Sequence, residues 1–239
     1  MQPQSNPAYF HARLAGVLYL IIIVCAGFAE GGVRASLIVP GDAALTAEHI
    51  LGSEFLYRLG FSLDLVAFLC DLGVSILFYV LLKPVNRTLA LTAAMLRLLA
   101  HPAIASVNLI NHYGALQILT NESLNAAFSA EQLQSIALLF TEFHTTGYLI
   151  AGAFFGMHCL LLGYLLVKSD LFPSLIGVFI GIAAVAYLLN SFGNFLMPEH
   201  RTFFDAIVVV PAVIAELSLG LWLLFKGVYN RRSVQVMSG

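Results

Sequence analysis

The chain has 239 residues, of which 60% are hydrophobic and only 10% are charged, which is less than half the charged fraction of an average soluble domain. This composition argues against a water-soluble monomer, because runs of about 20 apolar residues are long enough to cross a bilayer as helices. The net charge of -2 and the lack of any basic cluster larger than the pair Arg231 and Arg232 argue against nucleic acid as a partner. The lipid bilayer is the expected partner instead.

The apolar runs predict an all-α fold, a polytopic membrane helix bundle with six transmembrane helices. The expected spans are, to within a few residues, about 13–38, 56–82, 88–112, 134–167, 173–197 and 203–226. We expect residues 13–229 to form a single transmembrane domain, residues 1–12 to form a disordered N-terminal tail, and residues 230–239 to form a C-terminal tail.

The first span could instead be a signal peptide, because Gly27-Phe28-Ala29 resembles a small-residue cleavage site. We favour a helix that is not cleaved off. Glu30 and Arg34 stand four residues apart in the order that stabilises a helix, so their charges can pair and the helix can continue past them.

Basic residues are distributed unevenly between the two ends of the predicted bundle. The end with the termini carries Arg13, Lys83, Arg87, Lys168, Lys226, Arg231 and Arg232, whereas the other end carries Arg34, Arg58 and Arg201. The positive-inside bias therefore predicts cytoplasmic N- and C-termini, in the plasma membrane of a bacterium, that is, its inner membrane.

Two outer connections have helical patterns of their own. Residues 46–55 place apolar side chains near one face, which indicates a short helix on the outer surface. Ser129 and Gln132 have the spacing of a capping box, so the fourth span is expected to begin outside the membrane. Each segment could be a lid or a plain surface helix.

Ionisable residues inside the spans are the candidates for function, because each costs at least about 2.5 to 3.5 kcal/mol to insert. Four of them lie 10 to 12 residues from the basic residue that marks the inner boundary of their span, namely Asp71, Arg97, His158 and Glu216. At about 15 to 18 Å of helix, all four are predicted near the midplane. Arg97 needs a carboxylate there, and Asp71 and Glu216 are available. His158 could carry a proton, or the four could form a static network that fixes helix register.

A second polar layer is predicted toward the outside. It contains Glu30, Arg34, Asp64, Asn108, His112, Glu142, His144, Asn194 and Asp205. Helical angles align Asp64 with Asp71, align His101, Asn108 and His112 with Arg97, and align Asp205 with Glu216. In the fourth span His144 shares a face with His158, so we favour His144 over Glu142. These polar faces predict a cavity that opens to the outside.

The sequence leaves the cofactor undetermined. No Lys lies at the centre of a span to hold retinal, and the HExxH, GxSxG and GxxxxGK[ST] motifs are absent. Haem between two His residues, or a metal held by His112, His144 and an outer carboxylate, stays as an alternative. We assign no metal site.

Two GxxxG pairs, Gly152 with Gly156 and Gly177 with Gly181, predict close helix packing. Pro211 predicts a kink in the sixth span.

Scattered positions carry a resemblance to a known family. They are Arg13, Ala15, Gly16, Tyr19 and Leu20, Glu30 with Arg34, Gly41 and Asp42 before Thr46 and Ala47, Arg58 with Asp64, Arg97, Phe172 and Pro173 with Gly177, and Leu221, Trp222 and Leu223 after Glu216. Together these positions resemble a family of small bacterial multi-pass membrane proteins catalogued as a domain of unknown function. The resemblance covers nearly the whole chain, and it implies a polytopic inner-membrane protein with charges in its helices. It brings no substrate or catalytic residue.

We expect a six-span protein whose outward-facing polar cavity binds a small polar or amphiphilic ligand, for transport or for sensing. Asp71, Arg97 and Glu216 would form the charged floor, with His158 as a possible proton carrier. The walls would be lined by Asp64, His101, His112, His144 and Asp205. Transport by six helices would require a homodimer, although no inverted repeat is evident. The alternatives are a membrane-embedded enzyme acting on lipid or quinone, and a non-catalytic partner subunit.

Overall fold

The computed structural model describes residues 7–229, and within this range all regular secondary structure is helical. Six helical stretches are long and apolar enough to cross a membrane. They are Pro7–Leu37, Glu54–Leu82, Arg87–Thr120, Ala130–Lys168, Ser174–Leu196 and Pro198–Phe225. The prediction of an all-α bundle with six membrane-spanning helices is confirmed.

The first and third spans each contain a π-helical segment. The first consists of α1 (Pro7–Gly27), η1 (Phe28–Arg34) and α2 (Ala35–Leu37). The third consists of α5 (Arg87–Leu98), η2 (Leu99–Ala105) and α6 (Ser106–Thr120), with Pro102 inside η2. π-helical turns are rare and occur frequently at functional sites.

The start of the first helix differs from the prediction. Helix α1 begins at Pro7, so residues 7–12, which we expected to belong to the tail, form its first turns. Proline is favoured at the first position of a helix, since its missing N–H would be unpaired there. The packing of this turn also favours the helix, because Ala12 is fully buried and the Arg13 guanidinium lies 4.6 Å from the Tyr9 ring centroid. Residues 1–6 and 230–239, where the tails are predicted, lie outside the described residues.

The remaining spans are single helices. They are α4 (Glu54–Leu82), α8 (Ala130–Lys168), α9 (Ser174–Leu196) and α10 (Arg201–Phe225), the last preceded by the 3-10 turn η3 (Pro198–His200). Helix α10 continues through Pro211.

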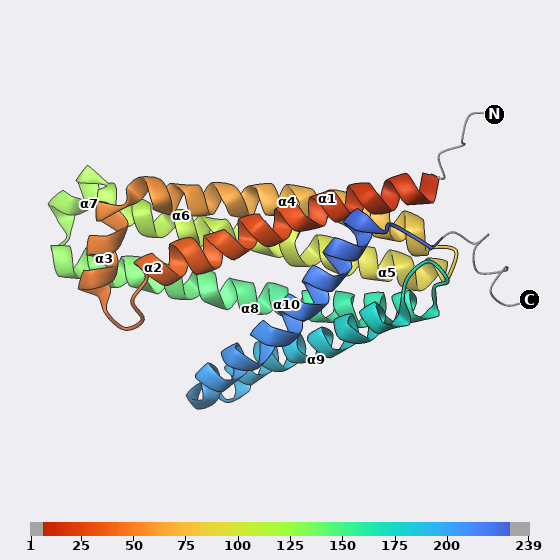
Figure 1. The fold of residues 1–239 in the computed structure, drawn as a ribbon. Coiled ribbons are helices and arrows are strands. Elements are labelled where there is room, and N and C mark those ends of the chain that lie inside the picture. Colours follow the sequence, from red (N-terminus) through yellow and green to blue (C-terminus); the bar gives the residue numbers. More distant parts are fainter. Residues whose placement is uncertain (1–6, 230–239) are drawn as a thin grey trace, which may run out of the picture.

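The spans pack as a closed ring, an order that the sequence could not give. Helix α1 packs against α4, α4 against α5, and the third span against α8. Helix α8 then packs along α9, α9 along α10, and α10 returns to α1 (Figure 1). At the far end α9 and α10 diverge from the other helices as a separate hairpin (Figure 1).

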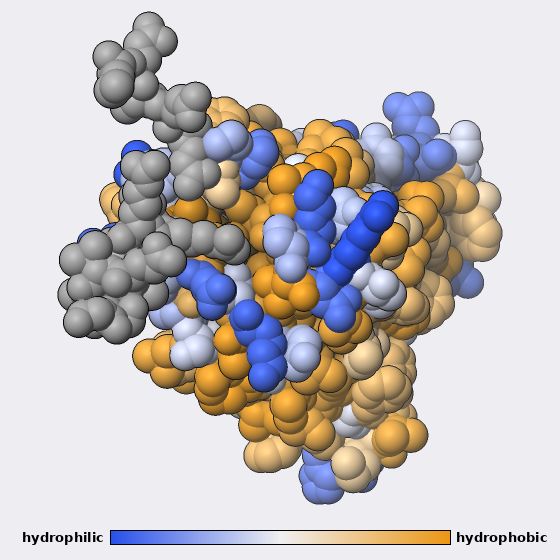
Figure 2. Space-filling model, turned by 90° about the vertical axis from the view of Figure 1, so that its right-hand side faces the viewer, coloured by the Kyte–Doolittle hydropathy of each residue, from blue (hydrophilic) through white to orange (hydrophobic). Residues whose placement is uncertain are grey.

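The two ends of the bundle are built differently. The start of α1, the end of α10, and the α4–α5 and α8–α9 connections share one end, which we call the termini end (Figure 1). Hydrophilic side chains gather on this end face, and hydrophobic ones surround them on the flanks (Figure 2). Many large apolar side chains on the flanks are exposed, among them Leu69, Val107 and Phe225. An apolar flank between polar ends is the surface expected of a bilayer-embedded bundle.

The opposite end, which we call the far end, carries short helices outside the spans. Helices α3 (Ala43–Gly52) and α7 (Glu122–Ala127) lie there (Figure 1). Asp42 caps α3, which begins at Ala43 and ends at Gly52 instead of covering the predicted residues 46–55. Ser129 and Gln132 form a complete capping box at the start of α8. With 39 residues, α8 is about 58 Å long, so it extends well beyond a hydrocarbon core of about 30 Å.

Glycines let α8 and α9 approach closely. A methyl group on Gly163 would lie 2.8 Å from the Gly177 carbonyl oxygen and 3.0 Å from the Gly181 backbone nitrogen. A methyl group on Gly177 would lie 2.7 Å from the Gly163 carbonyl oxygen, whereas one on Gly181 would meet nothing within 4 Å. The predicted Gly177 therefore lies in the contact, with Gly163 as its partner.

We expect Gly163→Ala to destabilise the bundle by about 1 to 3 kcal/mol, because the added methyl group meets backbone atoms that cannot move aside. Unfolding of the detergent-solubilised protein measures this change. Gly181→Ala is the matched control on the facing helix, since its methyl group has free space. Equal stability of the two variants would contradict the close approach.

Candidate functional site

Two clusters of buried polar side chains lie within the bundle, each beside a π-helical segment. The inner cluster is formed by Asp71, Arg97, His101 and His158, and it lies where α5 passes into η2. The outer cluster is formed by Glu30, Arg34, Asp64, Asn108, His112 and His144, and Arg34 is the last residue of η1. Helix α4 contributes an aspartate to each cluster, seven residues apart.

Arg97 is the centre of the inner cluster. Its Nε donates to Asp71 Oδ1 at 2.7 Å, and Nη2 forms an ion pair with the same carboxylate. Both side chains are only 1% exposed. The guanidinium carbon also lies 5.0 Å from the Tyr19 ring centroid and 5.3 Å from that of Phe155. This is the carboxylate partner that the predicted depth of Arg97 requires.

The two histidines of the inner cluster contact the Asp71–Arg97 ion pair, one on each side chain. His101 Nδ1 lies 2.5 Å from Asp71 Oδ2. His158 Nδ1 lies 2.8 Å from the Ala93 carbonyl oxygen, which can only accept, so Nδ1 carries the proton. His158 Nε2 then accepts from Arg97 Nη1 at 3.3 Å. Both nitrogens of His158 are therefore occupied, and this geometry does not support the predicted role of His158 as a proton carrier.

Glu216 differs from its predicted role. Its carboxylate accepts a short hydrogen bond from the Tyr187 hydroxyl on α9, rather than pairing with Arg97. The Tyr187 ring also lies against Phe155 of α8, with centroids 5.1 Å apart, so Tyr187 of α9 contacts both α8 and α10. The depth of Glu216 was predicted from α10 alone, and its partner depends on the order of the helices in the ring.

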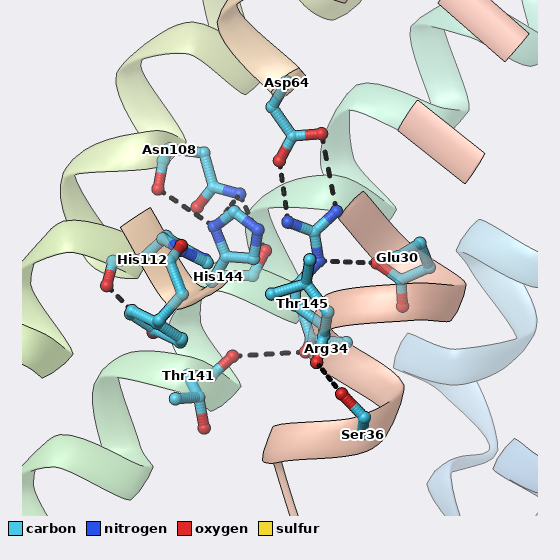
Figure 3. Close-up of polar contacts among 11 residues, drawn as sticks. Glu30, Arg34, Ser36, Asp64, Asn108, His112, Thr141, His144 and Thr145 are labelled. Carbon is cyan, nitrogen blue, oxygen red and sulfur yellow. Dashed lines mark hydrogen bonds and ion pairs between the residues drawn. The ribbon is translucent and has the colours of Figure 1, made fainter. Parts of the chain in front are cut away.

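The outer cluster is centred on Arg34, whose guanidinium lies between two carboxylates (Figure 3). Nη1 donates to Asp64 Oδ2 at 2.7 Å, and Nε donates to Glu30 Oε2 at 2.7 Å. The Asp64 side chain is fully buried, whereas 71% of the Glu30 side chain is exposed. Tyr148 of α8 covers the guanidinium, with its ring centroid 5.5 Å from the Arg34 carbon.

Two buried histidines lie next to this ion pair. Their ring centroids are 5.3 Å apart, and the His144 ring is 5.0 Å from the Tyr148 ring. His112 Nε2 lies 2.9 Å from the Tyr57 carbonyl oxygen, and His144 Nδ1 lies 3.2 Å from the Asn108 carbonyl oxygen. The other nitrogens, His112 Nδ1 and His144 Nε2, are buried and have no hydrogen-bond partner within residues 7–229.

A neutral imidazole has one N–H and one lone pair. Because the Tyr57 carbonyl oxygen can only accept, His112 carries its proton on Nε2. His144 Nδ1 lies 3.2 Å from the Asn108 carbonyl oxygen and 3.4 Å from the Asn108 side-chain nitrogen. Since that nitrogen donates to the His144 carbonyl oxygen at 2.7 Å, we assign the His144 proton to Nδ1, where it is donated to the Asn108 carbonyl oxygen. Each histidine therefore keeps an unpaired acceptor in the buried cluster. Buried polar atoms are nearly always satisfied, so two unpaired acceptors in one cluster are an unusual feature.

The residues predicted to line an open cavity are instead packed against one another. Asp64 is fully buried, and His112 and His144 are 1% and 3% exposed. Asn108 donates to the His144 carbonyl oxygen at 2.7 Å. The prediction of an open, outward-facing cavity at these residues is not met, because ion pairing and ring packing close the space between the helices.

Two predicted wall residues, His101 and Asp205, lie apart from the outer cluster, and so does Glu142, which we did not favour as a wall residue. His101 belongs to the inner cluster, where its ring lies between Phe68 and Phe155. Asp205 accepts from Asn190 and Asn194 at 2.9 and 3.0 Å, so it forms a separate group on the α9–α10 hairpin. Glu142 is exposed on α8.

Metal and haem ligation find little support in this arrangement. Within residues 7–229 no three His, Cys, Asp or Glu side chains are close enough together to hold a metal ion. His158 has no free nitrogen for an axial bond, which weakens the pairing of His101 with His158 about a haem.

Comparison with known proteins identifies the family. A family model described as Domain of unknown function (DUF4386) matches residues 14–227. The chain belongs to this family. An uncharacterized protein of the archaeon Archaeoglobus fulgidus is 25% identical over 157 residues, which cover 66% of this chain and 76% of the relative. No solved structure matches the chain.

Several aromatic residues of this DUF4386 chain were missed by sequence reasoning. Tyr57 stacks on His112 with centroids 4.0 Å apart and donates its hydroxyl to the His112 carbonyl oxygen. Tyr187 likewise donates its hydroxyl to Glu216, whereas Tyr19 and Tyr148 lay their rings against the guanidinium groups of Arg97 and Arg34. Tyrosine has an apolar ring and a polar hydroxyl, so inside a span it can contact both lipid-like and polar groups. The tyrosines within the spans were the available signal.

We expect Arg97→Ala to lower the free energy of unfolding by about 3 to 5 kcal/mol, because it leaves the Asp71 carboxylate buried without its partner. Unfolding in detergent measures this change. Arg58→Ala is the control, since Arg58 forms an exposed ion pair with Glu54 and its loss should change stability little.

The double variant Asp71→Leu with Arg97→Met distinguishes the cost of a buried carboxylate without a partner from the cost of losing the ion pair itself. It removes both charges and fills similar space, so it should be more stable than Arg97→Ala alone. Normal folding and expression of Arg97→Ala would show that the inner cluster does not stabilise the bundle.

Proposed function

We propose that the outer cluster binds a small polar or amphiphilic ligand, which the protein transports or senses. The observation that carries this proposal is the pair of buried, unpaired acceptors, His112 Nδ1 and His144 Nε2, beside the Arg34 ion pair. A ligand group that donates hydrogen bonds would satisfy both. The inner cluster offers no such atoms on its histidines, and we assign it a structural role.

The charge balance of the outer cluster favours a ligand with a positive group. Arg34 faces two carboxylates, those of Asp64 and Glu30, so the three ionised side chains leave one net negative charge. In the inner cluster Arg97 and Asp71 cancel. A primary amine supplies both a positive charge and three donors, and amines are therefore the ligand class that we propose.

The exposure of Glu30 indicates the route of entry. Its carboxylate lies at the edge of the cluster, and α10 packs against α1 but not against η1 to any large extent. The α9–α10 hairpin diverges from the other helices toward the far end (Figure 1). An amphiphile could reach Arg34 from the lipid with its chain still in the bilayer, provided that Tyr148 and η1 move aside.

Three probes of equal chain length test the ligand class, namely hexylamine, hexanol and hexanoate. We expect hexylamine to raise the thermal unfolding midpoint of the purified protein, because a ligand that binds only the native state stabilises it. Hexanol should stabilise it less, and hexanoate should not stabilise it at all. Equal effects of hexylamine and hexanoate would contradict the proposal.

Isosteric variants test the two histidines without removing their existing bonds. His112→Gln keeps a donor near the Tyr57 carbonyl, and His144→Asn keeps one near the Asn108 carbonyl. Each lacks the unpaired ring nitrogen, and we expect about tenfold weaker hexylamine binding, the effect of losing one hydrogen bond to a charged group. His200→Gln, at an exposed histidine of η3, is the control. Unchanged binding by both isosteric variants would remove the histidines from the site.

We also propose that the termini end is cytoplasmic and that the membrane is a bacterial inner membrane. Arg13, Lys83, Arg87, Lys168 and Lys226 support this orientation by their number at the termini end.

Cysteine labelling of cells tests the orientation. In a variant without the native cysteines, Ser123→Cys in α7 should react with an impermeant maleimide added outside, because the far end would face out. Thr88→Cys at the start of α5 should react only after the cells are opened. Both positions are exposed. The reverse labelling pattern would invert the proposed topology.

A further inference from the structure

A hollow of about 360 Å³ opens at the termini end, away from both buried clusters. It lies between the α4–α5 turn and the α8–α9 turn, and it is lined by Leu81, Pro84, Val85, Asn86, Tyr164, Lys168, Ser169, Asp170 and Leu171. Its volume is at the lower end of the range for small-molecule sites.

The walls of the hollow are held in place by hydrogen bonds of the two turns. The Asn86 side chain accepts from the Leu89 N–H at 3.0 Å, and the Ser169 hydroxyl accepts from the Leu171 N–H at 3.1 Å. The Tyr229 N–H donates to the Leu171 carbonyl oxygen at 3.0 Å, so the segment after α10 is hydrogen-bonded to the α8–α9 turn. The hollow is therefore a preformed feature.

Two opposite charges line the hollow without pairing. Lys168 and Asp170 are two residues apart, and among residues 7–229 neither forms an ion pair or a side-chain hydrogen bond with the other or with any other residue. Asp42 and Asn86 show that polar side chains at other turns of this bundle do form such bonds. A cation and an anion that line one hollow without pairing match a ligand that carries both charges.

We expect the hollow at the level of the lipid headgroups. Lys168 is the last residue of α8, and Tyr164 lies one turn further into the span with its ring half exposed. Tyrosine is enriched at the boundary between hydrocarbon and water. One further turn along, Leu160 is also exposed to lipid. A molecule in the hollow could therefore rest its apolar part on α8.

We propose that this hollow binds the headgroup of a zwitterionic phospholipid with a primary ammonium group. Lys168 contacts the phosphate, Asp170 contacts the ammonium group, and the acyl chains lie along Tyr164 and Leu160. Basic pockets between transmembrane helices are known to bind lipid headgroups. The carboxylate of Asp170 disfavours a purely anionic headgroup, and the exposed apolar side chains favour a lipid over a free phosphate ester. This site is independent of the outer cluster.

Native mass spectrometry of the full-length protein with added lipid tests the proposal. The probes are phosphatidylethanolamine and phosphatidylglycerol with the same acyl chains. We expect one phosphatidylethanolamine to be retained per chain, and Lys168→Gln to weaken its binding about tenfold. Asp170→Asn should also weaken phosphatidylethanolamine about tenfold while leaving phosphatidylglycerol unchanged or tighter. Lys83→Gln, at an exposed lysine of the same end that does not line the hollow, should change neither lipid.

The two lipids should respond differently to Asp170→Asn, and this difference distinguishes binding in the hollow from general electrostatic attraction of lipid to the basic end of the protein. If Asp170→Asn leaves phosphatidylethanolamine binding unchanged, or if Lys83→Gln weakens it as much as Lys168→Gln does, the proposal is wrong. Preference of the wild type for phosphatidylglycerol overturns it as well. Glycerophosphoethanolamine, which has the headgroup without chains, should displace the lipid only weakly, and equally strong binding of it would overturn the role of the acyl chains. Elution of each variant as one peak in size-exclusion chromatography checks its fold.

Discussion

A charged arginine inside a bilayer must meet a carboxylate, and helix α4 supplies one at each of two heights. Asp71 holds Arg97 of the third span, and Asp64 holds Arg34 of the first. These two pairs fix the rotation of α4 and bring both neighbouring spans against it. Loss of Asp71 would leave Arg97 buried without its carboxylate, and loss of Asp64 would leave Arg34 with only the exposed Glu30. The packing of three of the six spans therefore depends on one face of one helix.

The two clusters share this pairing but differ in whether the nitrogens of their buried histidines are paired. The inner cluster pairs both nitrogens of His158 and adds two aromatic rings to the Arg97 guanidinium. The outer cluster leaves two ring nitrogens unpaired and one carboxylate exposed. Paired histidines stabilise one conformation, whereas unpaired ones have capacity for a further partner. This difference supports the structural role that we propose for the inner cluster and the binding role that we propose for the outer one.

The sequence predicted those features that belong to a single helix. Span lengths, the capping box of α8 and the shared level of Arg97 and Asp71 depend only on spacing along the chain, and the structure contains all three. Contacts between helices also depend on their order around the ring, which spacing cannot give. Glu216 thus has another partner than the predicted Arg97, since Tyr187 comes from a neighbour that only the ring order identifies. The predicted open cavity is absent for the same reason, because residues that share a height and a face can still pack against each other.

The π-helical segment η1 gives the first span a register that an ordinary α-helix would not have. A π turn holds one residue more than an α turn, so residues on its two sides are offset by about 100° from a continuous α-helix. Arg34 is the last residue of this segment, so the direction of its side chain toward Asp64 depends on the turns that precede it. A one-residue deletion within Phe28–Arg34 would therefore turn Arg34 away from its partner while keeping every amino-acid type in the pair. Relatives in which this segment is one residue shorter should accordingly place their charged pair differently or lack it.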